Sequence, residues 1–133
     1  MKISELEKKS GISAYTLRYY EKAGLLRASQ RSSNNYREYS QDDLSTAKFI
    51  LACKQSGFSL AETSSLLAIK DNKDKHVCAE AKEITKNKIV QISEQIKQLE
   101  NMQNTLKKLE KICNGDNKSA EFCSIISTLE KDH

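Results

Sequence analysis

The feature that most constrains this chain is an uninterrupted stretch from Val77 to Ile112 that contains no glycine and no proline. Within this stretch and at the residue after it, positions at intervals of three and four form a mostly apolar series: Ile89, Ile92, Ile96, Leu99, then Met102 or Gln103, Leu106, Leu109 and Cys113. This spacing predicts one long helix with a narrow apolar stripe. Because a narrow stripe needs a partner helix rather than a globular core, we expect a dimeric coiled coil. A helix folded back on its own first domain is the alternative.

The composition agrees with a mostly helical protein. The 133 residues include no Pro and only four Gly. At about 150 residues per domain, this length excludes a large two-domain enzyme. No segment is apolar enough to span a membrane, and residues 1–10 carry too many charges for a secretory signal. We therefore expect a cytoplasmic protein whose four Cys are thiols, metal ligands or core atoms rather than disulfides.

Positive charge is concentrated in the first half of the chain. Residues 1–70 contain eleven Lys and Arg against seven Asp and Glu, whereas residues 71–133 contain eleven of each. All four Arg and all five Tyr lie between Tyr15 and Tyr39. Arg and Tyr are well suited to contact phosphates, and Arg also suits base edges. This pattern favours nucleic-acid binding over the alternative of a solvated basic face with tyrosines in the core.

Helix-boundary signals at the start of the chain predict a helix-turn-helix. A first helix, with Ser4 as its expected cap, ends at Gly11. A second helix, capped by Ser13, ends at Gly24. The second helix of such a pair normally enters the major groove of DNA.

The next signals predict a wing and two more helices. The polar segment 29–35, followed by two tyrosines at strand-like spacing, is typical of a basic hairpin. Ser40 is the expected cap of a third helix that ends at Gly57, and Ser59 opens a fourth with a capping box. A charged connector at residues 70–75 precedes the long helix.

Four segments of this first half carry a specific pattern: Lys2-Ile-Ser-Glu-Leu6, Thr16-Leu-Arg-Tyr-Tyr-Glu-Lys-Ala-Gly-Leu-Leu26, Asn35-Tyr-Arg-Glu-Tyr39 and Gly57-Phe-Ser-Leu-Ala-Glu62. In this order and spacing, and followed by a dimer helix, they resemble the MerR family of transcription regulators. That family usually has Asn-Gly-Tyr-Arg in the wing, where this chain has Asn34-Asn35-Tyr36-Arg37. Asn tolerates a positive φ, so we expect the same turn.

The resemblance implies a homodimer that binds an inverted repeat in promoter DNA through two winged helix-turn-helix modules. In this family, binding of an inducer bends and untwists the DNA. The distortion aligns widely spaced promoter elements for RNA polymerase. Carried over residue by residue, the expected DNA contacts are Tyr15, Thr16, Arg18, Tyr19, Arg31, Tyr36 and Arg37.

Three cysteines point to a metal ion as the inducer. Cys78 and Cys113 lie 35 residues apart, which is about 52 Å along a continuous helix. One chain cannot bring both to one ion, whereas two antiparallel helices place Cys78 of one subunit beside Cys113 of the other. The turn-rich segment 114–122 allows Cys123 to fold back over the helix end. We therefore predict a site of three thiolates from two chains: Cys78, Cys113 and Cys123.

The identity of the metal follows from the donors and from the resemblance. Family members that sense divalent ions have a Cys at the position of Cys78, where members that sense copper usually have Ser. Members that sense zinc commonly carry adjacent Cys and a His where this chain has Asn114 and Lys118. Three soft thiolates suit large, soft ions, so we expect Cd(II) or Pb(II) first, Zn(II) second and Hg(II) third. Candidates for an additional ligand are His76, Asp116 and Glu121, and Cys53 is expected in the core.

Other functions have less support in the sequence. It contains none of the common catalytic motifs, so we do not expect an enzyme. A thiol- or redox-responsive regulator of the same family and a coiled-coil adaptor without DNA binding are the alternatives. The predicted organisation is a winged helix-turn-helix domain at 1–70 (helix-turn-helix about 4–23, wing about 28–39), a linker at 71–76, a dimerisation helix at 77–112, and a metal-binding loop with a short helix at 113–133.

Overall fold

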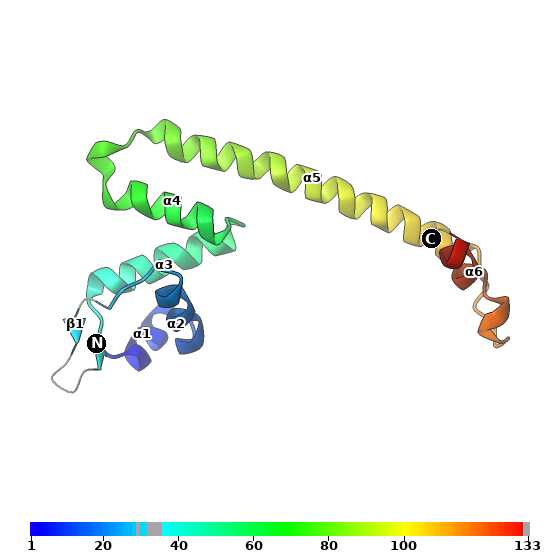
Figure 1. Ribbon diagram of the computed structural model, residues 1–133, viewed down its shortest axis with the longest axis horizontal. Coiled ribbons are helices and arrows are strands. Elements are labelled where there is room, and N and C mark those ends of the chain that lie inside the picture. Colours follow the sequence, from blue (N-terminus) through cyan, green and yellow to red (C-terminus); the bar gives the residue numbers. More distant parts are fainter. Residues whose placement is uncertain (29, 32–35, 132–133) are drawn as a thin grey trace. The chain divides into compact units, whose positions relative to one another are not determined.

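The computed structural model describes residues 1–28, 30–31 and 36–131, and it confirms the mostly helical fold class (Figure 1). Its elements are α1 (Ile3–Ser10), α2 (Ala14–Lys22), β1 (Gln30–Arg31), β2 (Arg37–Glu38), α3 (Gln41–Gln55), α4 (Leu60–Asp71), the short 3-10 helix η1 (Lys73–Lys75), α5 (Cys78–Lys111), a second 3-10 helix η2 (Ala120–Phe122) and α6 (Ser124–Lys131). The chain divides into two compact units, Met1–Lys88 and Ile89–His133.

Three helices begin at the predicted caps. At α2, the side-chain oxygen of Ser13 accepts a hydrogen bond from the backbone amide of Thr16 at 3.2 Å. At α3 and α4, Ser40 and Ser59 each form a capping box with the acidic residue three positions later. These caps satisfy amides that have no partner inside the helix, which explains why the helices begin at these residues.

The start of α1 differs from the prediction, because Ser4 is not its cap. The helix begins at Ile3, and Lys2 takes the N-cap position without a side-chain hydrogen bond. The amino group of Met1 donates to the backbone carbonyl of Tyr39 at 2.6 Å. This contact holds the chain against the end of the hairpin, and the helix begins immediately after it.

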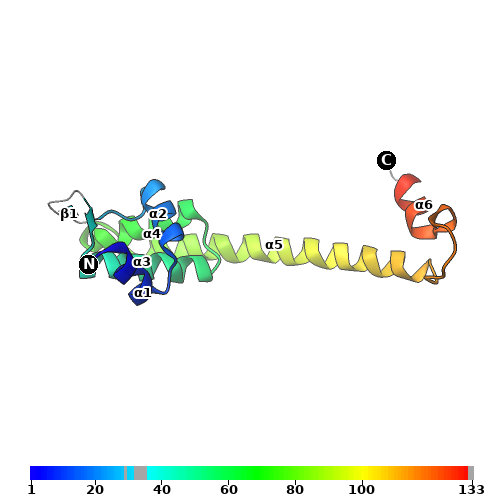
Figure 2. The same cartoon turned by 90° about the horizontal axis from the view of Figure 1, so that it is seen from below.

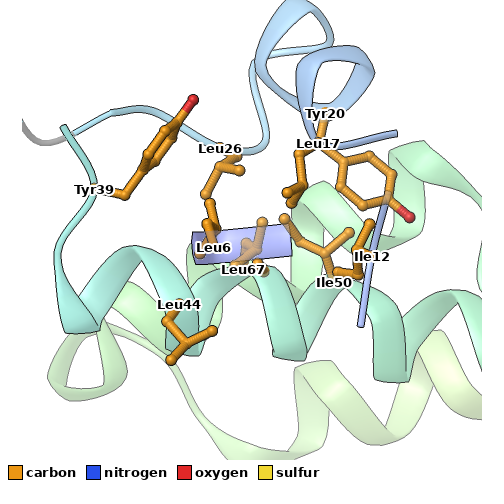
Figure 3. Packing of buried hydrophobic residues seen from close by; sticks show 10 residues of the cluster. Leu6, Ile12, Leu17, Tyr20, Leu26, Tyr39, Leu44, Ile50 and Leu67 are labelled. Atoms are coloured by element: carbon orange, nitrogen blue, oxygen red, sulfur yellow. The ribbon is translucent and has the colours of Figure 1, made fainter. Parts of the chain in front are cut away.

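The core of the first unit forms where α1, α2, α3 and α4 meet (Figure 3). Leu6, Leu17 and Ile50 are fully buried, and Leu67 of α4 packs into the same cluster. β1 and β2 pair antiparallel, with Arg31 opposite Arg37 in register. The predicted turn at Asn34 and Asn35 lies outside the described residues. Tyr39, which follows β2, is 3% exposed in this core and anchors the hairpin to the helices.

The first turns of α5 are attached to the first unit by an ion pair. The ammonium group of Lys88 lies 2.8 Å from the carboxylate of Glu62 in the first turn of α4, and Lys88 is buried. Lys88 and the backbone amide of Ser59 hydrogen-bond to that carboxylate and lower the pKa of Glu62. Because α4 contacts α3, the ion pair links the start of α5 to the helices of the first unit.

Beyond Lys88, α5 carries an exposed apolar stripe. α5 begins and ends within one residue of the predicted bounds. Figure 2 shows it as one long, uninterrupted helix. The exposed fraction is between 51% and 63% for five residues of this stripe: Ile89, Ile96, Leu99, Met102 and Leu106. Among the described residues, no helix is sufficiently long and apolar to cross a membrane.

Candidate functional site

The second helix of the helix-turn-helix presents one polar face. Leu17 and Tyr20 of α2 are buried, so helical periodicity turns the intervening positions outward. Tyr15 is 84% exposed and Tyr19 is 49% exposed, and Arg18 is exposed between them. Thr16 is half-buried, and its hydroxyl accepts a hydrogen bond from Ser13 at 3.0 Å.

The wing adds a second set of predicted contacts beside α2. Tyr36 and Arg37 are both exposed, and the ammonium group of Lys2 lies 5.0 Å from the ring centre of Tyr36. The backbone of Arg31 lies in β1, and its side chain is outside the described part of the chain. All the other predicted DNA contacts are therefore described, and all of them except the half-buried Thr16 are exposed.

Basic side chains from α2, the wing and the segment between them surround one open hollow of about 560 Å³. Arg18 and Arg37 both line it, which brings together one predicted contact from each element. Lys22 and Arg27 line the same hollow and were not singled out in the sequence analysis. The sequence did contain a signal for these two residues, because both belong to the excess of positive charge in residues 1–70. Four cations around one hollow suit an anionic backbone.

One acidic residue lies within this basic surface. A carboxylate oxygen of Glu21 lies 3.0 Å from Nε of Arg37, and the other accepts a hydrogen bond from the hydroxyl of Tyr39. Burial raises the pKa of Tyr39, and its hydrogen bond to Glu21 raises it further, so the hydroxyl stays protonated and donates. Glu21 was not predicted as a functional residue, although it is the only acidic residue in the sequence between Glu7 and Glu38.

Two of the predicted metal ligands meet at the carboxyl end of α5. The thiol of Cys123 donates to the sulfur of Cys113 at 3.9 Å, which confirms that the segment between them folds Cys123 back over the helix end. Two sulfurs bound tetrahedrally at a Zn–S distance of about 2.3 Å would lie roughly 3.8 Å apart. The sulfur pair therefore fits two ligands of one thiophilic ion without rearrangement.

The surroundings of Cys123 favour its thiolate form. Cys123 immediately precedes α6, and the backbone amides of Ile126 and Ile125 lower the pKa of its thiol. Cys113 accepts a hydrogen bond from the amide of Gly115 at 3.5 Å. Asp116 lines the same hollow as the two cysteines. Glu121 is not among the residues that line it, so of the two acidic candidates only Asp116 lines the hollow that contains the two cysteines.

The third predicted ligand, Cys78, lies in the other unit. It is exposed at the first residue of α5. His76 precedes it, and Nδ1 of this ring lies 3.0 Å from a carboxylate oxygen of Glu80. The hydrogen bond from His76 lowers the pKa of Glu80. Within the described part of a single chain, no three side chains of His, Cys, Asp or Glu come together as a metal site.

Cys53 is in the core, as predicted. Its side chain is 6% exposed, and burial raises the pKa of its thiol. A buried thiol that resists deprotonation is a poor metal ligand, because the thiolate is the binding form.

Comparison with protein families identifies the class. Residues 1–69 match the model of the MerR HTH family regulatory proteins, and residues 44–109 match the MerR DNA-binding model. The chain is 35% identical over 130 residues to the HTH-type transcriptional regulator ZntR of Escherichia coli K12, which covers 98% of this chain and 92% of that protein. The chain therefore belongs to the MerR family of helix-turn-helix transcription regulators.

Solved structures extend the similarity to the whole chain. The transcription regulator PbrR691 of Ralstonia metallidurans, in complex with lead(II), is 31% identical and superposes with a TM-score of 0.86, covering 97% of this chain and 98% of that one. The dual-function regulator MerR of Bacillus megaterium, in complex with mercury(II), is 30% identical with a TM-score of 0.70 over 98% and 99% of the two chains. The protein is a DNA-binding, metal-responsive transcriptional regulator and not an enzyme.

Proposed function

We propose that this protein is a homodimeric sensor of a soft divalent metal ion that activates heavy-metal resistance or efflux genes. The observation that carries the proposal is the pair of sulfurs of Cys113 and Cys123, 3.9 Å apart at one end of α5. Cys78 begins the same helix, and the length of that helix separates it from the pair within one chain. Each site then consists of Cys113 and Cys123 from one protomer and Cys78 from its partner.

The exposed stripe of α5 supports the dimer. Side chains such as Leu99 and Leu106, each 63% exposed, remain in water in one chain and become buried when a second α5 packs against them. Antiparallel pairing of two such helices places the amino end of one beside the carboxyl end of the other. Only that orientation brings Cys78 of one protomer to Cys113 of its partner.

The DNA partner is an inverted repeat in a promoter. Each protomer inserts α2 into a major groove, and Tyr15, Thr16, Arg18 and Tyr19 contact the DNA there. In the wing, Arg31, Tyr36 and Arg37 contact the backbone. Occupation of the sites by metal changes how the two DNA-binding modules of the dimer are set relative to each other. The promoter bends so that RNA polymerase in the cytoplasm can use it.

The donor set supports Cd(II) and Pb(II) over Zn(II), with Hg(II) third. Three thiolates provide soft donors, and segment 114–122 lacks the added Cys and His that would complete a tetrahedral zinc site. The lead complex of PbrR691, whose chain aligns over 97% of this one, supports Pb(II) as a candidate. Of the three candidates for a further oxygen or nitrogen ligand, Asp116 is the best placed.

Transcription in vitro from the promoter beside its own gene tests the function. Cd(II), Pb(II), Zn(II), Hg(II) and Cu(I) are titrated separately into the reduced protein, and we expect Cd(II) and Pb(II) to activate at the lowest free concentrations. Cys113→Ser should remove the response, and Cys53→Ala should retain it. Activation by Zn(II) or Cu(I) alone would contradict the proposed preference, and no response to any metal would contradict metal sensing.

A thiol redox sensor is the second candidate, because the same two sulfurs are in contact. Oxidation by peroxide would join Cys113 and Cys123 in a disulfide, with two electrons passing to the peroxide and its oxygens leaving as water. Activation by peroxide in the absence of added metal would favour this function. Activation by metal under reducing conditions would favour the first.

A further inference from the structure

The position of Glu21 presents an electrostatic conflict. Its carboxylate lies in a hollow with Arg18, Lys22, Arg27 and Arg37, which is the surface proposed to receive a DNA phosphate backbone. By charge alone, a carboxylate there repels the DNA and weakens binding. The Glu21 side chain is only 12% exposed, so it is built into the surface rather than extended into solvent.

The contacts of Glu21 tie two elements together. One oxygen pairs with Nε of Arg37 in the wing at 3.0 Å, and the other accepts the hydroxyl of Tyr39, which is buried in the core. Glu21 itself lies in the last turn of α2. The carboxylate therefore fixes the side chain of Arg37 relative to the helix that enters the groove.

Holding Arg37 by Nε leaves most of its donors for another partner. A guanidinium has five N–H donors in a rigid fork, and the contact through Nε uses one of them. The Arg37 side chain is 46% exposed, so the rest of the fork is accessible from solvent. An Arg that is already oriented loses less conformational freedom when it binds a phosphate.

We propose that Glu21 is a positioning residue of the DNA interface, which orients the guanidinium of Arg37 toward a backbone phosphate at the cost of its own repulsion. The inference rests on the proposed DNA-binding surface. It predicts a change in DNA affinity opposite to the change that charge alone would cause. Removing this negative charge should weaken DNA binding, although the surface becomes more positive.

The test measures binding of the full-length dimer to a fluorescent operator duplex, selected by the wild-type protein from a random-sequence pool. Glu21→Gln keeps the size of the side chain and removes its charge. We expect its affinity to fall about fivefold to tenfold, and the slope of log affinity against log salt to become shallower by about 1.8 as one phosphate contact is lost in each protomer of the dimer. Tighter binding by Glu21→Gln would overturn the inference.

The Arg37→Ala background separates positioning from a general structural role. There, Glu21 has no guanidinium to orient and only repels the DNA, so Glu21→Gln should leave binding unchanged or tighten it slightly. An equal loss in both backgrounds would overturn the inference and assign Glu21 to folding alone.

Glu21→Asp provides a second variant with the charge retained. Its shorter side chain cannot reach both partners, so we expect weaker binding, and unchanged binding would also overturn the inference.

Failure of the proposed function gives a different result. If the wild-type protein selects no duplex from the pool, DNA recognition itself is contradicted. If the wild-type protein selects a duplex and Glu21→Gln binds it as well as the wild type or better, only the role of Glu21 is contradicted.

Discussion

Replacing Cys113 or Cys123 with serine is expected to abolish tight metal binding, and Cys78→Ser is expected to do the same. Each substitution removes one of three thiolates, and we expect the affinity for Cd(II) or Pb(II) to fall on the order of 100-fold or more. Even groups that only orient a ligand are worth about 10–100-fold, so a direct ligand should be worth at least as much. Titration of reduced protein against a competing chelator measures the affinity.

The matched control for these variants is Cys53→Ala. It also removes one thiol, but this thiol is buried among core residues in α3 and has a raised pKa. We expect its metal affinity and its stoichiometry of one ion per chain to match those of the wild type. Retention of full affinity by Cys78→Ser would show that the site does not include this residue.

The second large effect is expected from the double variant Arg18→Ala with Arg37→Ala. These side chains line one hollow from two different elements. A hydrogen bond to a charged group is worth about 1.5–3 kcal/mol, so loss of two such contacts in each protomer, four in the dimer, should lower operator affinity by about 10,000-fold or more. The salt slope should become shallower by about 3.6. Fluorescence anisotropy over a range of salt concentrations measures both.

The control for loss of charge alone is the double variant Lys97→Ala with Lys107→Ala, which changes two exposed residues of α5. This variant has the same net charge as the arginine double variant. Because neither lysine is among the predicted DNA contacts and exposed charges are strongly screened at about 0.1 M salt, we expect the affinity of this variant to stay within about twofold of the wild type. Equal losses in the two double variants would contradict the assignment of the surface.

Local signals in the sequence were sufficient to predict most of the fold. Caps such as Ser13 and Ser59 depend only on residues three positions away, so they are visible without tertiary structure. The error at Ser4 arose from a contact that is distant in sequence, because the Met1 amino group bonds to the carbonyl of Tyr39. Helix periodicity predicted α5 to within one residue, since a long apolar pattern without Gly or Pro leaves few alternatives.

The parts of the candidate site that depend on the spacing of residues along the chain were predictable from the sequence. The turn-rich segment after α5 indicated that Cys123 returns to Cys113, and the structure brings their sulfurs together. The role of Glu21 was not predictable, because it depends on Arg37 and Tyr39, which lie 16 and 18 residues further along the chain. The same holds for Lys88, whose partner Glu62 lies in a different helix.

A mixed-dimer experiment tests most directly whether two chains share each metal site. Subunits with Cys78→Ser are unfolded, mixed in equal amounts with subunits carrying Cys113→Ser and Cys123→Ser, and refolded together under reducing conditions. Neither variant binds metal alone, but random pairing makes half of the dimers mixed, each with one complete site of two. We expect about a quarter of the wild-type amount of bound Cd(II). If the mixture binds no more than its parents, the shared site does not exist.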